Sequence, residues 1–189
     1  MRATTRSTRA AVDSAGSMAT GAKGARGGGV LVWFRRDLRL HDNETIHQAA
    51  VRAKQLQLQA GHVGTNVDFC YVHRREGPNG EPWHRRQGGA SLAFLGASLR
   101  ALDARLCETW GQGSKLIYRE CEDDDDSLAS TLAEIAQACG SSEVFFGRGY
   151  EPKLREEERH AQMQLSKAHG LRSKSFATFL LHEPDKIAI

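Results

Sequence analysis

The sequence lacks most of the short motifs that mark common classes of enzyme and binding protein. The four cysteines contain no CxxC pair, which argues against a zinc site or a thioredoxin-type redox site, and we expect reduced, mostly structural thiols. No GxGxxG follows the first apolar run and no GxxxxGK[ST] occurs, which disfavours a conventional dinucleotide or ATP site. No segment approaches the ~20 apolar residues of a membrane-spanning helix. We therefore expect no membrane association.

Residues 1–29 have few bulky apolar side chains and a single acid, Asp13. They contain five basic residues, so the remainder of the chain has a net charge of −1 although the whole chain has +3. Net charge thus gives no indication of a nucleic-acid surface on the folded part. We predict that this segment is a disordered basic tail. An Arg- and Ser-rich, acid-poor composition also fits a transit peptide to a chloroplast or mitochondrion. The alternative is an untargeted extension of an intracellular protein of the nucleus or cytoplasm.

Short apolar runs alternate with helical patterns from residue 30 onward. The predicted strands are 30–34, 67–73, 115–120, 143–146 and 171–176, and the predicted helices are 43–59, 89–110, 128–139 and 154–169. In the helix at 89–110 leucines recur at spacings of three and four, which predicts one face packed on a sheet. This alternation predicts an α/β fold: a Rossmann-like, doubly wound, five-stranded parallel sheet flanked by helices.

Charged and polar residues follow the first and the fourth predicted strands. Arg35, Arg36 and Asp37 come directly after the first strand, and the loop after the fourth contains Tyr150 and Glu151. Ligands of open α/β sheets bind outside the carboxyl ends of the strands, so we expect the two loops to lie together. An arginine fork can hold an anionic or polar ring, a carboxylate can accept ring N–H groups, and a tyrosine can stack. These five residues are the candidate cofactor-binding residues.

The same charges also fit a structural role. The two arginines and Asp37, with Arg39 and Asp42, could form only an ion-pair network that braces the first loop, and Tyr150 could be a half-buried structural residue. Both interpretations stay open at this point. The acidic run at 122–126 precedes a predicted helix, where the helix dipole stabilises acids. We interpret that run as structural rather than as a metal site.

Four short segments occur in the order found in a known family. They are LVWFRRDLRLHDN at 31–43, GGAS at 88–91 with SL at 98–99, YEP at 150–152 with Arg155 and Glu158, and SF at 175–176 with LLHEP at 180–184. As a set they resemble the photolyase/cryptochrome family, which usually has Asp where this chain has Glu158. The resemblance covers about residues 29–189. It implies that residues 30–189 form the α/β domain with which members of that family begin.

The resemblance also implies a second domain. In the family a helical domain holds FAD, the electron-transfer tryptophans and most of the DNA-binding surface, and it carries out light-driven DNA repair or blue-light photoreception. This chain ends at Ile189, so we expect a fragment without that domain, without photorepair activity of its own and without direct DNA binding. Its expected partner in a full-length protein is the helical FAD domain. Photolyase and cryptochrome are not distinguished by these residues.

Many family members carry an antenna chromophore, a folate, a deazaflavin or a flavin such as FMN, in the domain that this chain resembles. Arg36 and Glu151 match antenna-side loops. Two departures leave the chromophore open. Gly149 stands where deazaflavin-type members commonly have an acid, and Lys153-Leu154 stands where bacterial folate-type members have Asn-Glu. The family's antenna cleft lies partly between the two domains, so we expect weak binding by the isolated domain.

Two alternatives stay open beside this interpretation. The domain could be a stand-alone binding or regulatory module that associates with a partner protein through the surface that normally meets the helical domain. It could also be a nucleotide-binding protein unrelated to light, although no glycine-rich phosphate loop supports that. Because one face of the family's α/β domain normally docks against the helical domain, we expect marginal stability and some aggregation for this domain alone.

Overall fold

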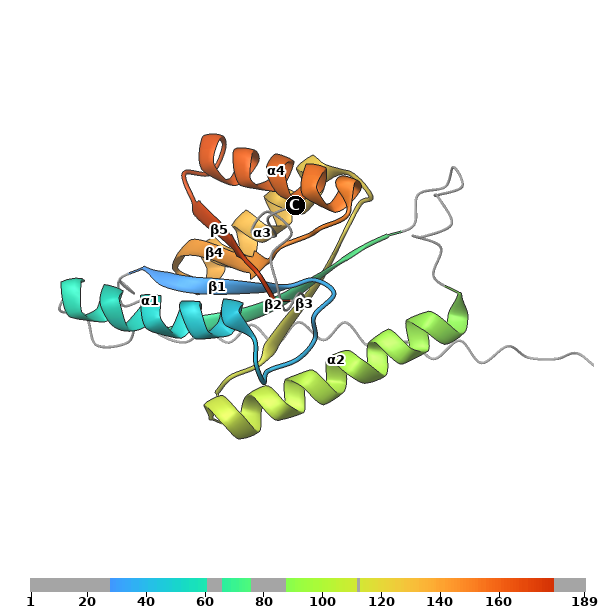
Figure 1. Cartoon of the computed structure of the whole chain (residues 1–189), viewed down its shortest axis with the longest axis horizontal. Helices are drawn as coiled ribbons and strands as arrows, with labels where there is room; N and C mark the ends of the chain where they lie inside the picture. The colour runs from blue at the N-terminus through green and yellow to red at the C-terminus, as the bar shows by residue number, and fades with distance from the viewer. Residues whose placement is uncertain (1–27, 61–65, 76–87, 112, 179–189) are drawn as a thin grey trace, which may run out of the picture.

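The computed structural model describes residues 28–60, 66–75, 88–111 and 113–178, in which strands and helices alternate (Figure 1). The elements are β1 (Gly29–Phe34), α1 (Glu44–Ala60), β2 (Val67–Arg74), α2 (Gly89–Trp110), β3 (Leu116–Cys121), α3 (Asp125–Cys139), β4 (Ser141–Gly147), α4 (Pro152–Lys167) and β5 (Arg172–Phe176). All nine predicted elements are confirmed, with ends displaced by at most three residues. The expectations for residues 1–27 of the tail and for the 180–184 segment lie outside the described residues, whereas Gly29, which was placed in the tail, is the first residue of β1.

The five strands form one parallel sheet in the order β3-β2-β1-β4-β5. Along the chain, β2 and β3 are therefore added on one side of β1, and β4 and β5 are then added on its other side. All six residues of β1 are buried, as expected for a central parallel strand covered on both faces. The switch point of the topology lies between β1 and β4, which confirms the doubly wound α/β fold.

Two helices cover each face of the sheet. In Figure 1, α3 and α4 lie above the sheet and α1 and α2 lie below it. Because side chains alternate along a strand, Val30 and Val32 of β1 join the core under α1 and α2, whereas Leu31 and Trp33 join the core under α3 and α4. The sheet thus separates two hydrophobic cores, one on each of its faces.

Local capping sets several helix ends. Asn43 caps the N-terminus of α1, because its Oδ1 accepts a hydrogen bond from the Thr45 N–H at 3.0 Å. At α3 the N-cap is Asp124, whose carboxylate accepts from the Ser127 N–H at 2.6 Å. Acids therefore form the first turn of α3, and the helix begins three residues earlier than predicted. Gly140 ends α3 in the left-handed region at φ 72°, where glycine meets no steric cost.

Helix α2 packs on the sheet through only half of its length. Leu99, Leu102 and Leu106 are buried, but Leu92 is 43% exposed and Phe94 is 74% exposed. The prediction that the whole leucine face packs on the sheet is therefore wrong for the first half. Twenty-two helical residues span about 33 Å, and an eight-residue strand spans about 26 Å, so the helix outruns the sheet (Figure 1). Neither α2 nor any other described helix is long and apolar enough to cross a membrane.

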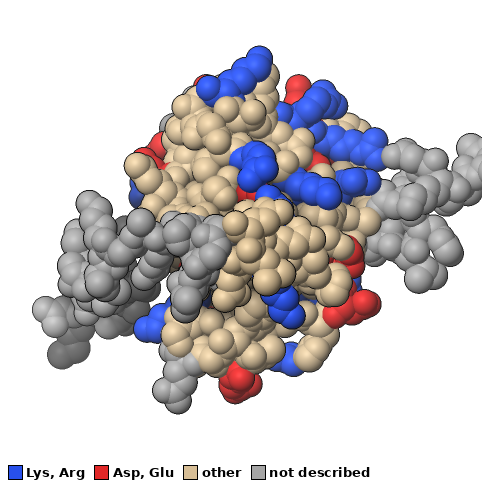
Figure 2. Space-filling view, turned by 90° about the vertical axis from the view of Figure 1, so that its left-hand side faces the viewer, with Lys and Arg blue, Asp and Glu red and all other residues tan. Residues whose placement is uncertain are grey.

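The edge strand β5 carries exposed basic side chains. Arg172 and Lys174 alternate with less exposed neighbours along this five-residue strand. Figure 2 looks at the side of the molecule where β1 begins, and its basic side chains gather mainly in the upper half, toward α4. A short edge strand with protruding charges resists pairing with another sheet. We therefore assign the exposed charges of β5 to protection of the edge.

All four cysteines are free thiols, in agreement with the prediction from sequence. Burial raises the pKa of Cys121 to about 11 and raises that of Cys70 as well. Because the thiolate is the reactive form, raised pKa values make both thiols poor nucleophiles. Cys70 and Cys121 therefore serve as core residues.

Candidate functional site

The loops after β1 and β4 meet at the switch point, as predicted. They enclose a pocket of about 170 Å³ beside the first turn of α4. Its lining residues are Arg35, Arg36, Gly147, Arg148, Gly149, Tyr150, Glu151 and Leu154. Four of the five candidate residues line this pocket, and Asp37 does not.

Arg36 and Glu151 form an ion pair across the pocket. Arg36 donates through both terminal nitrogens, at 2.6 Å to Oε1 and 3.3 Å to Oε2 of Glu151. The two side chains are 53% and 59% exposed. An exposed pair contributes about 0–1 kcal/mol, and fork geometry places this one toward the upper end of that range. Each group can therefore exchange its present partner for a ligand at little cost.

Arg35 points into the protein rather than toward solvent. Its side chain is 9% exposed, and its guanidinium donates to Glu157 at 2.8 Å. Glu157 also accepts from Arg74 at 2.9 Å, and Arg74 in turn pairs with Asp123 and Asp125. A structural ion-pair network therefore exists, but its members differ from those predicted: Arg35 joins Glu157 of α4 and, through Arg74, acids of the 122–126 run, rather than Asp37 or Asp42. Among the described residues no group of three or more His, Cys, Asp or Glu side chains could hold a metal ion.

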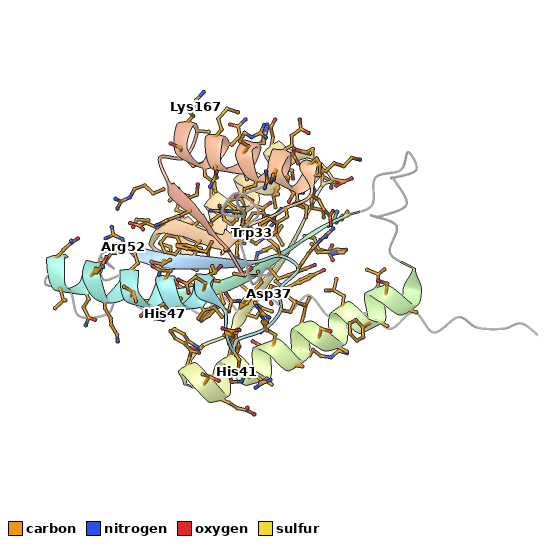
Figure 3. All side chains as sticks on the ribbon, in the orientation of Figure 1. Trp33, Asp37, His41, His47, Arg52 and Lys167 are labelled. Carbon is orange, nitrogen blue, oxygen red and sulfur yellow. The ribbon has the colours of Figure 1, made fainter. Side chains whose placement is uncertain are left out.

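Asp37 lies in the connection between β1 and α1, beyond the strand that carries Trp33 (Figure 3). It borders a separate cavity of about 20 Å³ and pairs with Arg39 at 3.1 Å. Arg39 also donates to the carbonyl of Thr178, and so ties this connection to the chain after β5. Burial raises the pKa of the Asp37 carboxyl, and the opposing effect of Arg39 does not cancel it. The folded protein therefore holds this charge at a cost.

An Asp37→Asn variant is expected to be more stable than the wild type at pH 7. Folding raises the pKa of this carboxyl, so the protonated group stabilises the fold below its unfolded pKa of about 3.9. That contribution is lost as the pH rises through the pKa of the folded state. The gain should therefore vanish near pH 3.5. Urea unfolding at both pH values measures it, with Glu134→Gln at an exposed site on α3 as control. A variant less stable than the wild type at pH 7 would mean that pairing with Arg39 dominates.

Sequence reasoning missed Glu157, and it singled out Leu154 only as a departure from the folate-type members of the family. Leu154 forms a wall of the pocket, and Glu157 holds Arg35 in place. Both lie on the face of α4 that continues through Glu158, Ala161 and Leu165, the helix's buried residues. The sequence did contain a signal for Glu157, because acids fall on the apolar stripe of this helix and a buried acid needs a partner.

Comparison with known proteins agrees with this architecture. The sequence profile of the family described as DNA photolyase matches residues 30–188. The chain belongs to the photolyase/cryptochrome family. The fold resemblance extends to solved structures: a bacterial class III photolyase from Agrobacterium tumefaciens superposes with a TM-score of 0.63 at 26% identity, over 91% of this chain and 30% of that one. The matched region is the N-terminal domain of the family.

Named relatives include both a cryptochrome and a photolyase. The photolyase/cryptochrome domain described here is 34% identical over 158 residues to Cryptochrome-1 of Arabidopsis thaliana, covering 84% of this chain and 20% of the relative. It is 29% identical over 176 residues to the (6-4)DNA photolyase of Oryza sativa subsp. japonica, covering 93% of this chain and 30% of the relative. The chain thus spans 20% to 30% of the length of these relatives.

Proposed function

We propose that this domain holds an antenna chromophore at the switch point and passes excitation to a flavin in a photolyase or cryptochrome. The observation that carries the proposal is the pocket of about 170 Å³ in which Arg36 and Glu151 face each other. An exposed guanidinium fork and a carboxylate beside Tyr150 supply both signs of charge and a ring face. That combination suits a planar heterocycle with N–H groups and an anionic substituent.

The pocket fits part of such a chromophore. Cofactor-sized pockets typically measure ~300–1,000 Å³, so about 170 Å³ takes one edge of a ring system and leaves the rest outside. A side chain at Gly149 has no room, because its Cβ would lie 2.6 Å from the Cβ of Leu154. The acid common in deazaflavin-type members therefore cannot be accommodated here without moving Leu154. The remaining ring surface would lie against the second domain of a full-length protein.

The roles of the residues follow from their present contacts. Glu151 accepts N–H groups of the ring edge, while Arg36 moves from Glu151 to the anionic substituent. Tyr150 offers its ring for stacking. The bound chromophore supplies absorption of near-ultraviolet and blue light, and the protein sets its orientation and its electrostatic surroundings. These residues make or break no covalent bond in this role.

Reconstitution tests the proposal directly. The purified chain is titrated with a folate, a deazaflavin and FMN up to millimolar concentration, and absorption is followed from 300 to 500 nm. We expect one of them to bind, and Arg36→Ala to weaken binding about 10- to 100-fold, as for the loss of a hydrogen bond to a charged group. Arg159→Ala, at an exposed site on α4 outside the pocket, is the control. Absence of binding by the wild type, or equal binding by Arg36→Ala, would contradict the proposal.

A second candidate function is association with a protein partner through α2. Leu92 and Phe94 are exposed in the first turns of the helix, beyond the sheet. They lie on different sides of the helix, and each exposes apolar surface of the kind found at interaction sites. This candidate predicts self-association at tens of micromolar by light scattering, reduced by the Leu92→Ser/Phe94→Ser double variant. Leu58→Ser, at an 85% exposed site on α1, should leave the mass unchanged. A wild type that is monomeric throughout this range would exclude self-association through α2.

A further inference from the structure

Arg35 and Arg36 are neighbours in sequence but belong to different layers of the site. The Arg35 guanidinium lies 5.0 Å from the centre of the Trp33 ring and 5.9 Å from that of Phe146. Such cation–π contacts favour a fixed, desolvated arginine. Arg35 also donates to the carbonyl of Gly147 at 3.3 Å, in addition to its bond with Glu157. Turning it toward a ligand would break all of these contacts at once.

Glu158 also holds this loop. Its side chain is 11% exposed, and its Oε2 accepts the Gly149 N–H at 3.0 Å. The same oxygen lies 3.7 Å from Nη1 of Arg35. A buried carboxylate is costly unless it is paired and hydrogen-bonded, and these two contacts supply both conditions. Arg35 and Glu158 thus bind backbone groups that are two residues apart in the loop.

The loop between these two anchors fits closely against α4. At Gly149 an added Cβ would lie 2.6 Å from the Cβ of Leu154, so the backbone passes against the helix without space for a side chain. Tyr150 and Glu151 follow at once, and Glu151 is the N-cap residue of α4. The position of the pocket's ligand-facing residues therefore depends on how the backbone of Gly147 and Gly149 is held.

We propose that Arg35 and Glu158 are positioning residues of the switch-point pocket. They hold the backbone of Gly147 and Gly149 so that Glu151 faces Arg36 across the pocket. Arg35, which sequence reasoning placed among the ligand contacts, then acts beneath the ligand rather than on it. The consequence for binding rests on the proposed function, whereas the anchoring of the loop can be measured without any ligand.

Hydrogen exchange of the Gly149 amide in the full chain tests the anchoring. Glu158→Leu removes the acceptor, whereas Glu158→Gln keeps an acceptor oxygen. We expect exchange at Gly149 to accelerate roughly 10- to 100-fold in the first variant, and considerably less in the second. Exchange of the Val32 amide in central β1 should stay unchanged. If Glu158 merely stabilised the whole fold, its loss would accelerate exchange at Val32 as well. Unchanged exchange at Gly149, or equal acceleration at Val32, would overturn the proposal.

Two further measurements separate this proposal from the proposed function. Arg35→Lys keeps the charge but cannot reach Glu157 and the Gly147 carbonyl together, so it should also accelerate exchange at Gly149. This variant therefore tests the anchoring even if Glu158→Leu fails to fold. The reconstituting chromophore should then bind Glu158→Leu about 10-fold more weakly, with rescue in Glu158→Gln. A wild type that binds none of the three chromophores refutes the proposed function, while the exchange data still decide the anchoring. Tight binding by a variant with accelerated exchange would overturn the positioning role.

Discussion

Replacing Phe146 with alanine is expected to lower the free energy of unfolding by about 3–5 kcal/mol, the range for removal of a buried phenyl ring. The ring is completely buried in β4, at the centre of the core under α3 and α4. It packs edge-on against Trp33, with ring centres 5.1 Å apart. Few domains exceed 15 kcal/mol in total, so this single change removes a large share of the stability.

The chain offers a matched control for this prediction. Phe94→Ala removes the same atoms from a side chain that is 74% exposed on α2, and it should change the stability by less than about 0.5 kcal/mol. Urea unfolding followed by circular dichroism compares the two variants with the wild type. If both variants unfold at similar urea concentrations, Phe94 is buried by association in solution or Phe146 is not a core residue.

The Phe146 variant also connects the core with the pocket. Arg35 lies over the rings of Trp33 and Phe146, so loss of one ring removes part of the surface that supports its guanidinium. Phe146→Leu, which keeps most of the volume, is expected to cost less than the alanine variant and still weaken the support of Arg35. The packing of Phe146 in β4 thus affects how rigidly Arg35 is held beneath the pocket.

The order of the elements and the meeting of the two loops were predictable from the sequence. Alternating apolar runs and helical periodicity identify a parallel sheet, and its topology brings the ends of β1 and β4 together. Arg36 and Glu151 were therefore correctly placed at one edge. Periodicity also found the leucine stripe of α2, but it contains no information on how far the neighbouring strands extend. The overhang at Leu92 follows from that difference in length.

The direction of individual side chains was beyond the reach of the sequence. Arg35 and Arg36 are equivalent in composition and adjacent in position, yet one is 9% exposed and the other 53%. Which one turns inward depends on the acids of α4, which are more than 120 residues away in the chain. Asp37 was grouped with them because it is adjacent, but the chain has already turned toward α1 there. Its side chain meets Arg39 instead of the pocket.

The network around Arg74 shows how strongly such distant acids depend on one cation. Arg74 ends β2, and its guanidinium is within 2.9 Å of Asp123, Asp125 and Glu157. Its side chain is 15% exposed, and those of Asp123 and Glu157 are 7% and 12% exposed. The attraction of these carboxylates raises the pKa of Arg74 despite its burial. One arginine therefore joins the end of β2 to the beginning of α3 and to α4.

Arg74→Ala is accordingly expected to cost about 3–5 kcal/mol, because it leaves partly buried carboxylates close together without their shared cation. Arg75→Ala provides the control in the next residue. Arg75 is 58% exposed and pairs with the exposed acids Glu120 and Glu122, so its removal should cost no more than about 1 kcal/mol. Chemical denaturation measures both. Equal, small losses would mean that water replaces Arg74 at the acids, and the network would then contribute orientation rather than stability.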